Sequence, residues 1–385
     1  MHPRERLLRT ISCEKADRVP LYFRLFGFRP PEHLAWSNAR ERLERWHSLG
    51  VDEFLGTRPP VSMHSEVTTR SWDEPPTSEM PYTVLHKEYT TPSGTITQAV
   101  RWADSEEETG WCRQPREVQL FDDFNVPRAV KHAVTGPEDL PALRHLLGDI
   151  DEASLAECRQ QAAELKKLAE EEGSIVVGSG LHGTDAAIWL CGVEGAIMAA
   201  VDRPDFFEEL LDAIHYVDKR RVEVLIDLGV DMIARRGWYD TTRFWSPELY
   251  RRFIKPRLAE LVDMAHQAGV KFTYLMSCGV TPLLDDFIDM GIDLHQHIDP
   301  VQGGDDLAAV KAKLGGKVAS LGGINSAITL GSGTKDEIRA AVKHAMEVMK
   351  PGGGFILSPV DCLFPDTPWE SVQTVIDTWR EMCDY

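Results

Sequence analysis

The chain has 385 residues, 43% of them hydrophobic and 27% charged, which is the composition of an ordinary globular protein. Its 61 acidic residues outnumber its 42 basic ones, and the net charge of −19 argues against nucleic acid or an anionic membrane as the main partner. We find no apolar run of about 18 residues and no signal-peptide pattern. Since the seven cysteines are scattered, without a Cys-x-x-Cys pair, we expect a cytoplasmic protein with reduced thiols.

The N-terminal third contains two short predicted strands among irregular segments. Residues 4–11 have the amphipathic pattern of a short helix. Residues 18–27 (RVPLYFRLFG) predict a first strand, residues 34–49 a helix and residues 51–55 a second strand. Residues 56–81 are rich in Pro, Ser and Thr, so we expect an extended loop there.

Residues 82–104 alternate between apolar and polar side chains on both sides of Pro92-Ser93-Gly94. This pattern predicts a β-hairpin. The hairpin interrupts an α/β pattern, so we expect it to belong to an excursion, residues 57–125, that lies outside the main sheet and near its functional end.

From residue 137 onward, predicted helices alternate with short apolar runs. A long helix is expected over 137–172. The apolar runs are 174–179, 231–235, 271–276, 292–297, 317–322 and 354–359. Such an alternation is typical of a buried parallel sheet, and the two early strands bring the number to eight, so we predict a single (β/α)8 TIM barrel domain over residues 1–385. Neither a GxGxxG after the first strand nor a P-loop occurs.

Two loops that follow predicted strands carry one cysteine each, Cys278 and Cys362. Loops after the strands of a parallel barrel meet at one mouth, so both thiols can serve there as soft metal ligands. We expect a zinc site made by Cys278, Cys362 and Asp361, where either Asp361 or Cys362 supplies the ligand after the last strand. His297 and His182 are further candidates. The alternative is that both cysteines are buried thiols that only pack.

Polar and aromatic side chains also follow the predicted strands. We expect Asp240, His297 and Tyr239 to act in catalysis, because a carboxylate or imidazole can orient or deprotonate a leaving group. The expected substrate-binding residues are Arg24, His182, Trp238, Arg235 and His295, since arginine beside an aromatic ring can hold a carboxylate or a ring. One of His295 and His297 should face the mouth. Packing of Trp238 and Tyr239 in a lid, and of His295 in the core, is the alternative.

Four blocks follow one another along the chain: RERLLRTISCEKADRVPLYFRLFG, SPELYRRFIKPRL, KVASLGGIN and GGGFILSPVDCLFPDTP. Blocks similar to these occur in the same order in the uroporphyrinogen decarboxylase superfamily, which the chain resembles over nearly its whole length. The decarboxylase branch has an RQAGR-like segment after strand one, of which Arg24 and Gly27 are kept. The corrinoid-dependent methyltransferase branch has His-x-Cys-Gly after strand five; here Cys278 and Gly279 match, and Met276 replaces the histidine.

The resemblance to the methyltransferase branch implies a barrel that takes a methyl group from a small methylated substrate, such as an aryl methyl ether, and passes it to a corrinoid. Because no DxHxxG segment occurs, the cobalamin would arrive on a separate corrinoid protein. Zinc would polarise the heteroatom of the substrate. A decarboxylase of a small acid that uses Arg24, Arg235 or Arg236 with Asp240 is the alternative enzyme, and a non-catalytic binding barrel is a third hypothesis. No nucleic acid or membrane partner is expected, and a homodimer stays open.

Overall fold

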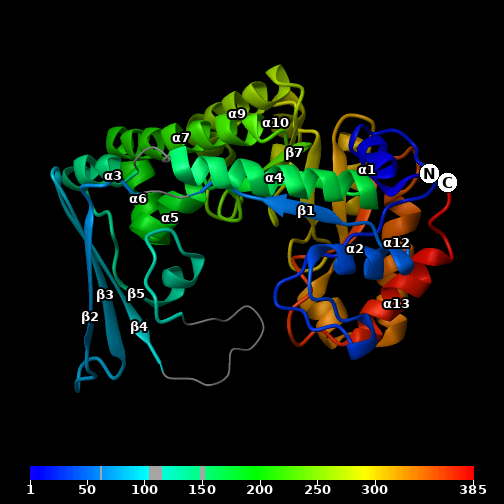
Figure 1. Cartoon of the computed structure of the whole chain (residues 1–385), viewed down its shortest axis with the longest axis horizontal. Helices are drawn as coiled ribbons and strands as arrows, with labels where there is room; N and C mark the ends of the chain where they lie inside the picture. Colours follow the sequence, from blue (N-terminus) through cyan, green and yellow to red (C-terminus); the bar gives the residue numbers. More distant parts are fainter. Residues whose placement is uncertain (61–62, 104–114, 148–151) are drawn as a thin grey trace. The chain divides into compact units, whose positions relative to one another are not determined.

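The structure is a computed structural model that describes residues 1–60, 63–103, 115–147 and 152–385. The chain forms two compact units. The parallel-sheet unit comprises Met1–Pro59, Arg159–Leu181 and Val222–Tyr385, and the hairpin unit comprises Pro60–Cys158 and His182–Arg221. Both chain termini belong to the parallel-sheet unit, where they lie close together (Figure 1) and Arg18 forms a bridge to Asp384.

A seven-stranded parallel sheet forms the centre of the parallel-sheet unit. Its strands are β1 (Phe54–Thr57), β6 (Ile175–Leu181), β7 (Met232–Arg236), β8 (Lys271–Leu275), β9 (Leu294–Ile298), β10 (Ala319–Asn325) and β11 (Phe355–Val360). They are neighbours in the order β1-β6-β7-β8-β9-β10-β11, which is also their order in the chain. The six apolar runs therefore form parallel neighbouring strands as predicted, because a strand covered on both faces needs apolar side chains on both.

The segment that was expected to be the first strand contacts both edges of this sheet through isolated bridges. Leu21 pairs in parallel with Leu357 of β11, and Tyr22 pairs in parallel with Asp52, just before β1. The Tyr22 N–H donates to the Leu357 carbonyl at 3.0 Å, and the Asp52 N–H donates to the Leu21 carbonyl at 2.8 Å. Pro20 has no N–H to donate to a ladder, which is one reason why no continuous strand forms here. The second predicted strand is β1, shifted by a few residues.

Helix α1 (Pro3–Ile11) covers the end of the sheet at which the strands begin. Its Leu7 and Ile11 belong to the same buried cluster as Ile175 and Met232, which open β6 and β7. Arg4 of this helix donates to the Ser174 carbonyl at 2.9 Å and forms an ion pair with Asp231, both of which directly precede those strands. Because α1 covers this end, we look for the functional site at the opposite end of the sheet, where the strands finish.

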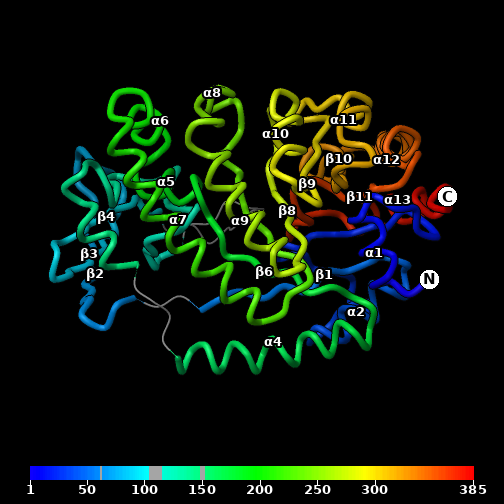
Figure 2. Tube along the Cα trace, turned by 90° about the horizontal axis from the view of Figure 1, so that it is seen from above, coloured from blue at the N-terminus to red at the C-terminus, as the bar shows by residue number. Residues whose placement is uncertain are grey.

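The other helices of this unit flank the sheet. They are α2 (Ala39–Ser48), α8 (Pro247–Leu249), α9 (Lys255–Gln267), α10 (Leu284–Asp289), α11 (Leu307–Leu314), α12 (Lys335–Met349) and α13 (Trp369–Arg380), with short 3-10 helices η1 (Glu32–Leu34) and η5 (Thr281–Leu283) and π-helical turns η4 (Tyr250–Ile254) and η6 (Ser326–Leu330). Figure 2 shows α10, α11 and α12 side by side in chain order. The helix expected over 34–49 begins only at Ala39, because the Asn38 side chain caps it by accepting the Glu41 N–H.

The hairpin unit contains a four-stranded antiparallel sheet in the order β2-β3-β4-β5. Its strands are β2 (Thr68–Glu74), β3 (Thr83–Thr91), β4 (Gly94–Trp102) and β5 (Ala129–Lys131). β3 and β4 confirm the hairpin over the described part of 82–104; residue 104 lies outside the described residues. The expectation of an extended loop over 56–81 is wrong at β2, whose sequence TTRSWDE is polar and largely exposed, so it lacks the apolar alternation that predicts a strand.

The remaining helices of the hairpin unit include α3 (Leu140–Leu146), α5 (Thr184–Cys191) and α6 (Val193–Asp202), with 3-10 helices η2 (Asp123–Arg128) and η3 (Pro137–Asp139); α4 (Glu152–Glu172) and α7 (Pro204–Asp227) have residues in both units. The single helix expected over 137–172 is wrong, because Leu147 leaves helical geometry at ψ 54° after α3. No single described helix is long and apolar enough to cross a membrane; α5 and α6, which meet at 108°, pass on length and composition only when taken together.

Candidate functional site

Three of the predicted site residues come together where the strands of the parallel sheet end. Trp238 follows β7, and Asp361 follows β11 directly. The guanidinium carbon of Arg24 lies 5.4 Å from the centre of the Trp238 ring, and Arg24 Nη1 lies 3.9 Å from Asp361 Oδ1. The backbone explains this meeting: the Leu363 N–H donates to the Arg24 carbonyl at 2.7 Å, which ties the two loops together.

Arg24 has unused hydrogen-bonding capacity. Its Nη1 is buried, and no hydrogen-bond partner for it lies among the described residues, although the Asp361 carboxylate is near. Burial lowers the pKa of this guanidinium, but the nearby Cys362 and Asp361 outweigh that effect, and the net pKa is raised. A buried charged donor without a partner is costly, so this nitrogen is well suited to an anionic or acceptor group of a ligand.

His297 is turned out of the normal strand alternation by a β-bulge. In the pairing of β9 with β10, Gln296 faces Leu321 and Ile298 faces Gly322, which leaves His297 as the extra residue, with a φ of 76°. Regular alternation would put His295 and His297 on the same face. Bulges of this kind re-aim side chains and are frequent next to active sites.

The two histidines consequently have different surroundings. His295 packs against Phe287 of α10, with ring centres 4.9 Å apart, and its Nε2 lies 3.0 Å from the Met276 carbonyl oxygen. His297 is close enough to Asp361 and Arg24 for both charges to act on its pKa. Burial lowers the pKa of each histidine to about 4, so both imidazoles are neutral at neutral pH. His297 Nδ1 is buried and has no hydrogen-bond partner among the described residues.

Asp240 and Arg235 form a buried ion pair with each other. Asp240 has no exposed surface, and it also accepts a hydrogen bond of 2.5 Å from the Tyr274 hydroxyl. Gly237 makes this arrangement fit, because a Cβ at that position would lie 2.5 Å from Arg235 Nη1 and from Tyr274 Cε2. In the RRGWYD segment, the side chains of Arg235 and Asp240 are therefore closely packed against Tyr274, and a side chain larger than that of glycine at position 237 would collide with them.

Trp238 and Tyr239 belong to the same segment. The guanidinium carbons of two arginines lie near the Trp238 ring, that of Arg24 at 5.4 Å and that of Arg236 at 4.5 Å from its centre. Such contacts hold an aromatic ring and a guanidinium face to face. Tyr239 stacks on Phe244 at 6.0 Å, and its carbonyl accepts the Trp245 indole N–H at 2.7 Å.

The predicted metal ligands are only partly brought together. Cys362 is buried and its Sγ donates to Asp361 Oδ1 at 3.5 Å. Cys278 is half-buried with a φ of 70°, and its carbonyl accepts the Thr241 hydroxyl at 3.0 Å. Burial raises the pKa of both thiols. Among the described residues, Cys278, Cys362 and Asp361 do not form a group of three with ligand atoms within 4.8 Å of one another. The six described cysteines are free thiols, and Cys112 lies outside the described residues.

His182 belongs to the hairpin unit. Its backbone N–H and that of Gly183 donate to the Asp218 carboxylate, at 3.2 Å and 2.9 Å. Its ring meets Trp189 of α5 edge-on, with centres 5.0 Å apart. These contacts of His182 are with residues of its own unit.

A second polar cluster at the strand ends was not anticipated. The Asn325 amide, at the end of β10, donates to Asp299 Oδ2 and to Gln302 Oε1, each at 2.9 Å. The Asp299 N–H donates to Asp305 at 3.0 Å, and burial raises the pKa of Asp305 to about 6. The sequence signal was available, because Asn325 lies three residues after the predicted strand 317–322 and Asp299 two residues after the predicted strand 292–297.

This arrangement defines an α/β protein with a parallel sheet and a polar site where its strands end. The uroporphyrinogen decarboxylase (URO-D) family model matches residues 123–382, and the chain belongs to that family. The methylcobamide:CoM methyltransferase MtaA of Methanosarcina barkeri is 27% identical over 188 residues, which are 49% of this chain and 52% of that protein; its counterpart from strain Fusaro is 28% identical over 192 residues. The chain thus matches about half the length of these curated relatives.

A solved structure agrees over the entire length. The methyltransferase from Methanosarcina mazei superposes with a TM-score of 0.59 at 18% identity and covers 99% of both chains. At this identity the likeness shows a common fold. The expected resemblance to the uroporphyrinogen decarboxylase superfamily, and to methyltransferases within it, is confirmed.

Proposed function

We propose that the chain is a methyltransferase that takes a methyl group from a small methylated substrate and passes it to a corrinoid. The observation that carries this proposal is the contact of Arg24 with Trp238 and Asp361 at the strand ends, with His297 near enough for the charges of Arg24 and Asp361 to affect its pKa. Arg24 Nη1 and His297 Nδ1 are buried and have no hydrogen-bond partner among the described residues. The methyltransferase relatives supply the reaction class. In this proposal the segment 18–27, expected as the first strand, closes the seven-stranded sheet into a barrel with this site at its mouth.

Each residue of the cluster has a task in this proposal. Arg24 binds an anionic group of the substrate through its Nη1, which has no hydrogen-bond partner among the described residues. Trp238, whose ring contacts both Arg24 and Arg236, contributes apolar surface to the binding of an aromatic or planar part of the substrate. His297, neutral at physiological pH, hydrogen-bonds through Nδ1 to the heteroatom that carries the methyl group and stabilises it as the methyl leaves.

Asp240 and Tyr239 act as positioning residues in this scheme. Asp240 is fully paired with Arg235 and Tyr274, so it is suited to keeping the loop after β7 in place. Tyr239 keeps the same loop in place through its contacts with Phe244 and Trp245. His295 keeps β9, and with it His297, in place through its contacts with Phe287 and the Met276 carbonyl.

The nucleophile has to come from outside this chain. A methyl ether carbon is a poor electrophile, and the side chains of the cluster are a guanidinium, an indole and a neutral imidazole. A reduced corrinoid supplies a nucleophile of sufficient strength when a partner protein delivers it. The zinc ion expected at Cys278, Cys362 and Asp361 stays a prediction, and no step of this proposal uses a metal.

Product analysis tests the proposal. Wild-type protein is incubated with methylated aromatic and aliphatic acids, with and without reduced cobalamin, and both methylated cobalamin and carbon dioxide are measured. Methylation of the corrinoid that needs protein and substrate supports methyl transfer. Release of carbon dioxide without any corrinoid would favour the decarboxylase, and the absence of both products would favour a binding barrel.

A further inference from the structure

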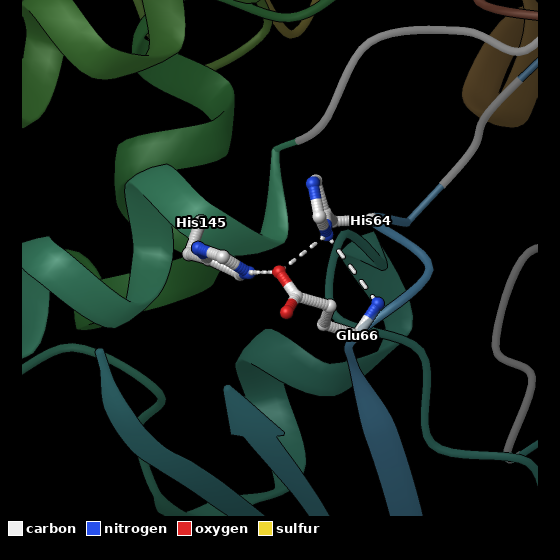
Figure 3. Close-up of side chains that lie close together, drawn as sticks. All are labelled: His64, Glu66 and His145. Atoms are coloured by element: carbon white, nitrogen blue, oxygen red, sulfur yellow. Dashed lines mark hydrogen bonds and ion pairs between the residues drawn. The ribbon is translucent and has the colours of Figure 1, made fainter. Parts of the chain in front are cut away.

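We propose that His64, Glu66 and His145 of the hairpin unit bind a divalent transition-metal ion of the zinc type, at a site separate from the cluster described above. Figure 3 shows the three side chains pointing toward one another, with the Glu66 carboxylate between the two imidazoles. Their ligand atoms all lie within 4.8 Å of one another. His64 and Glu66 precede β2, and His145 lies in the last turn of α3.

The spacing of the ligand atoms matches a metal site better than a hydrogen-bonded one. Glu66 Oε2 lies 3.5 Å from His64 Nδ1 and 3.7 Å from His145 Nε2. Both distances exceed those of ordinary hydrogen bonds. Around a tetrahedral zinc ion with bonds of about 2.0–2.1 Å, neighbouring ligand atoms are about 3.4 Å apart. A small movement of the side chains would therefore complete the coordination.

His145 provides an independent sign of a missing partner. Its Nε2 is buried, and no hydrogen-bond partner for it lies among the described residues. His64 Nδ1 accepts the Glu66 backbone N–H at 3.3 Å, a long hydrogen bond that a metal bond would replace. The centres of the His64 and His145 imidazole rings lie 4.5 Å apart. The two nitrogen ligands are therefore already close enough to bind the same ion.

The backbone on both sides keeps these side chains near each other. The Val67 N–H donates to the His64 carbonyl at 2.9 Å, which closes a tight turn and places His64 and Glu66 on the same side of it. α3, which carries His145, packs against β3 and β4 of the same unit. A bound ion would thus connect the segment before β2 to a helix on the other part of the sheet.

The donor set indicates the class of ion. Two imidazoles and one carboxylate suit zinc and other first-row divalent ions, whereas calcium and magnesium prefer oxygen ligands. Three protein ligands leave one position for water. The His64 and Glu66 side chains are 43% and 60% exposed, so solvent reaches the site. The proposal does not depend on the methyltransferase hypothesis, because the two sites share no residue.

A metal titration of the full chain tests this proposal. The protein is stripped with a chelator, and zinc binding is measured by calorimetry; cobalt(II) is added in parallel, since its visible absorption reports tetrahedral coordination. We expect H145A and E66Q each to lower the affinity by at least about 100-fold, because even the loss of an outer-shell partner costs about 10–100-fold. H64A, at an exposed position, provides a third variant if H145A fails to fold.

The matched control is E74Q. Glu74 is 60% exposed like Glu66, and it lies 3.3 Å from His86, but a third ligand does not accompany this pair among the described residues. E74Q and C278S should bind zinc as the wild type does. The proposal would be overturned by a wild-type protein that binds no zinc. It would also be overturned if E66Q and H145A bound zinc normally, or if C278S removed the binding, which would assign the ion to the strand-end cysteines.

Discussion

Arg24 differs from its neighbour Arg29 in what surrounds it. Arg24 is close to Trp238 and Asp361 and keeps one buried nitrogen without a partner among the described residues, whereas Arg29, in the same loop, is exposed. If Arg24 binds the anionic group of the substrate, the planar guanidinium matters as well as the charge.

We therefore expect R24K to raise KM by about 10–100-fold, the equivalent of one or two hydrogen bonds to a charged group, with a smaller change in kcat. R29K is the control and should leave both constants unchanged. Steady-state kinetics of the two variants decide the matter. Equal values for R24K and the wild type would remove Arg24 from the substrate site.

The bulged His297 gives a prediction about pH. Its pKa is about 4 in the folded protein against an ordinary 6.5, so the unfolded chain takes up a proton that the folded one refuses between these values. The free energy of unfolding contributed by this residue is therefore complete above pH 6.5 and is lost as the pH falls toward 4. Asp52 and Glu53, whose pKa values burial raises to about 6 and about 7, act in the opposite direction.

H297N isolates the histidine, because asparagine tolerates the positive φ of 76° and does not titrate. We expect the Tm of the wild type to fall more between pH 6.5 and 4 than the Tm of H297N. Asp52 and Glu53 are present in both proteins, so their contribution to the change in Tm cancels in the comparison. Thermal melts at several pH values measure this. Parallel curves for the two proteins would show that His297 is not held neutral by the fold.

At the scale of the element, the loop after β7 depends on a glycine that the packing around it requires. A Cβ at Gly237 would collide with the ion pair of Arg235 and Asp240, whereas Gly56 in β1 has open space around the corresponding position. We expect G237A to lower the free energy of unfolding by about 1–3 kcal/mol through overpacking. G56A should be close to neutral. Denaturant titration of both variants is the measurement, and equal stability would contradict the packing described for this loop.

The elements also show what a sequence can and cannot predict. β8 to β11 were predictable because runs such as KFTYL are apolar on both faces and are bounded by helices. β2 was not, since it is a polar edge strand whose identity comes from pairing with β3. The bulge at His297 was equally hidden, because the pairing register is set by β10 and leaves no local pattern. The meeting of Arg24 with Asp361 followed from the logic of parallel strands, whose ends share one edge.

At the scale of the whole molecule, the residues near the strand ends come from two distant parts of the chain. The family model spans residues 123–382, which include β6 to β11 with Trp238, His297 and Asp361. Arg24 lies outside the matched range and joins the site through its backbone hydrogen bond with Leu363.

The most direct test of the central claim is the rate at which reduced cobalamin is methylated by the wild type, by H297N and by R24K, followed by the absorbance change of the corrinoid. We predict that the wild-type reaction needs both substrate and corrinoid. H297N should lower kcat by about 100-fold, as expected for the loss of a group that stabilises the leaving atom, and R24K should act mainly on KM. Methylation at the wild-type rate in both variants, or carbon dioxide release in the absence of corrinoid, would contradict the account.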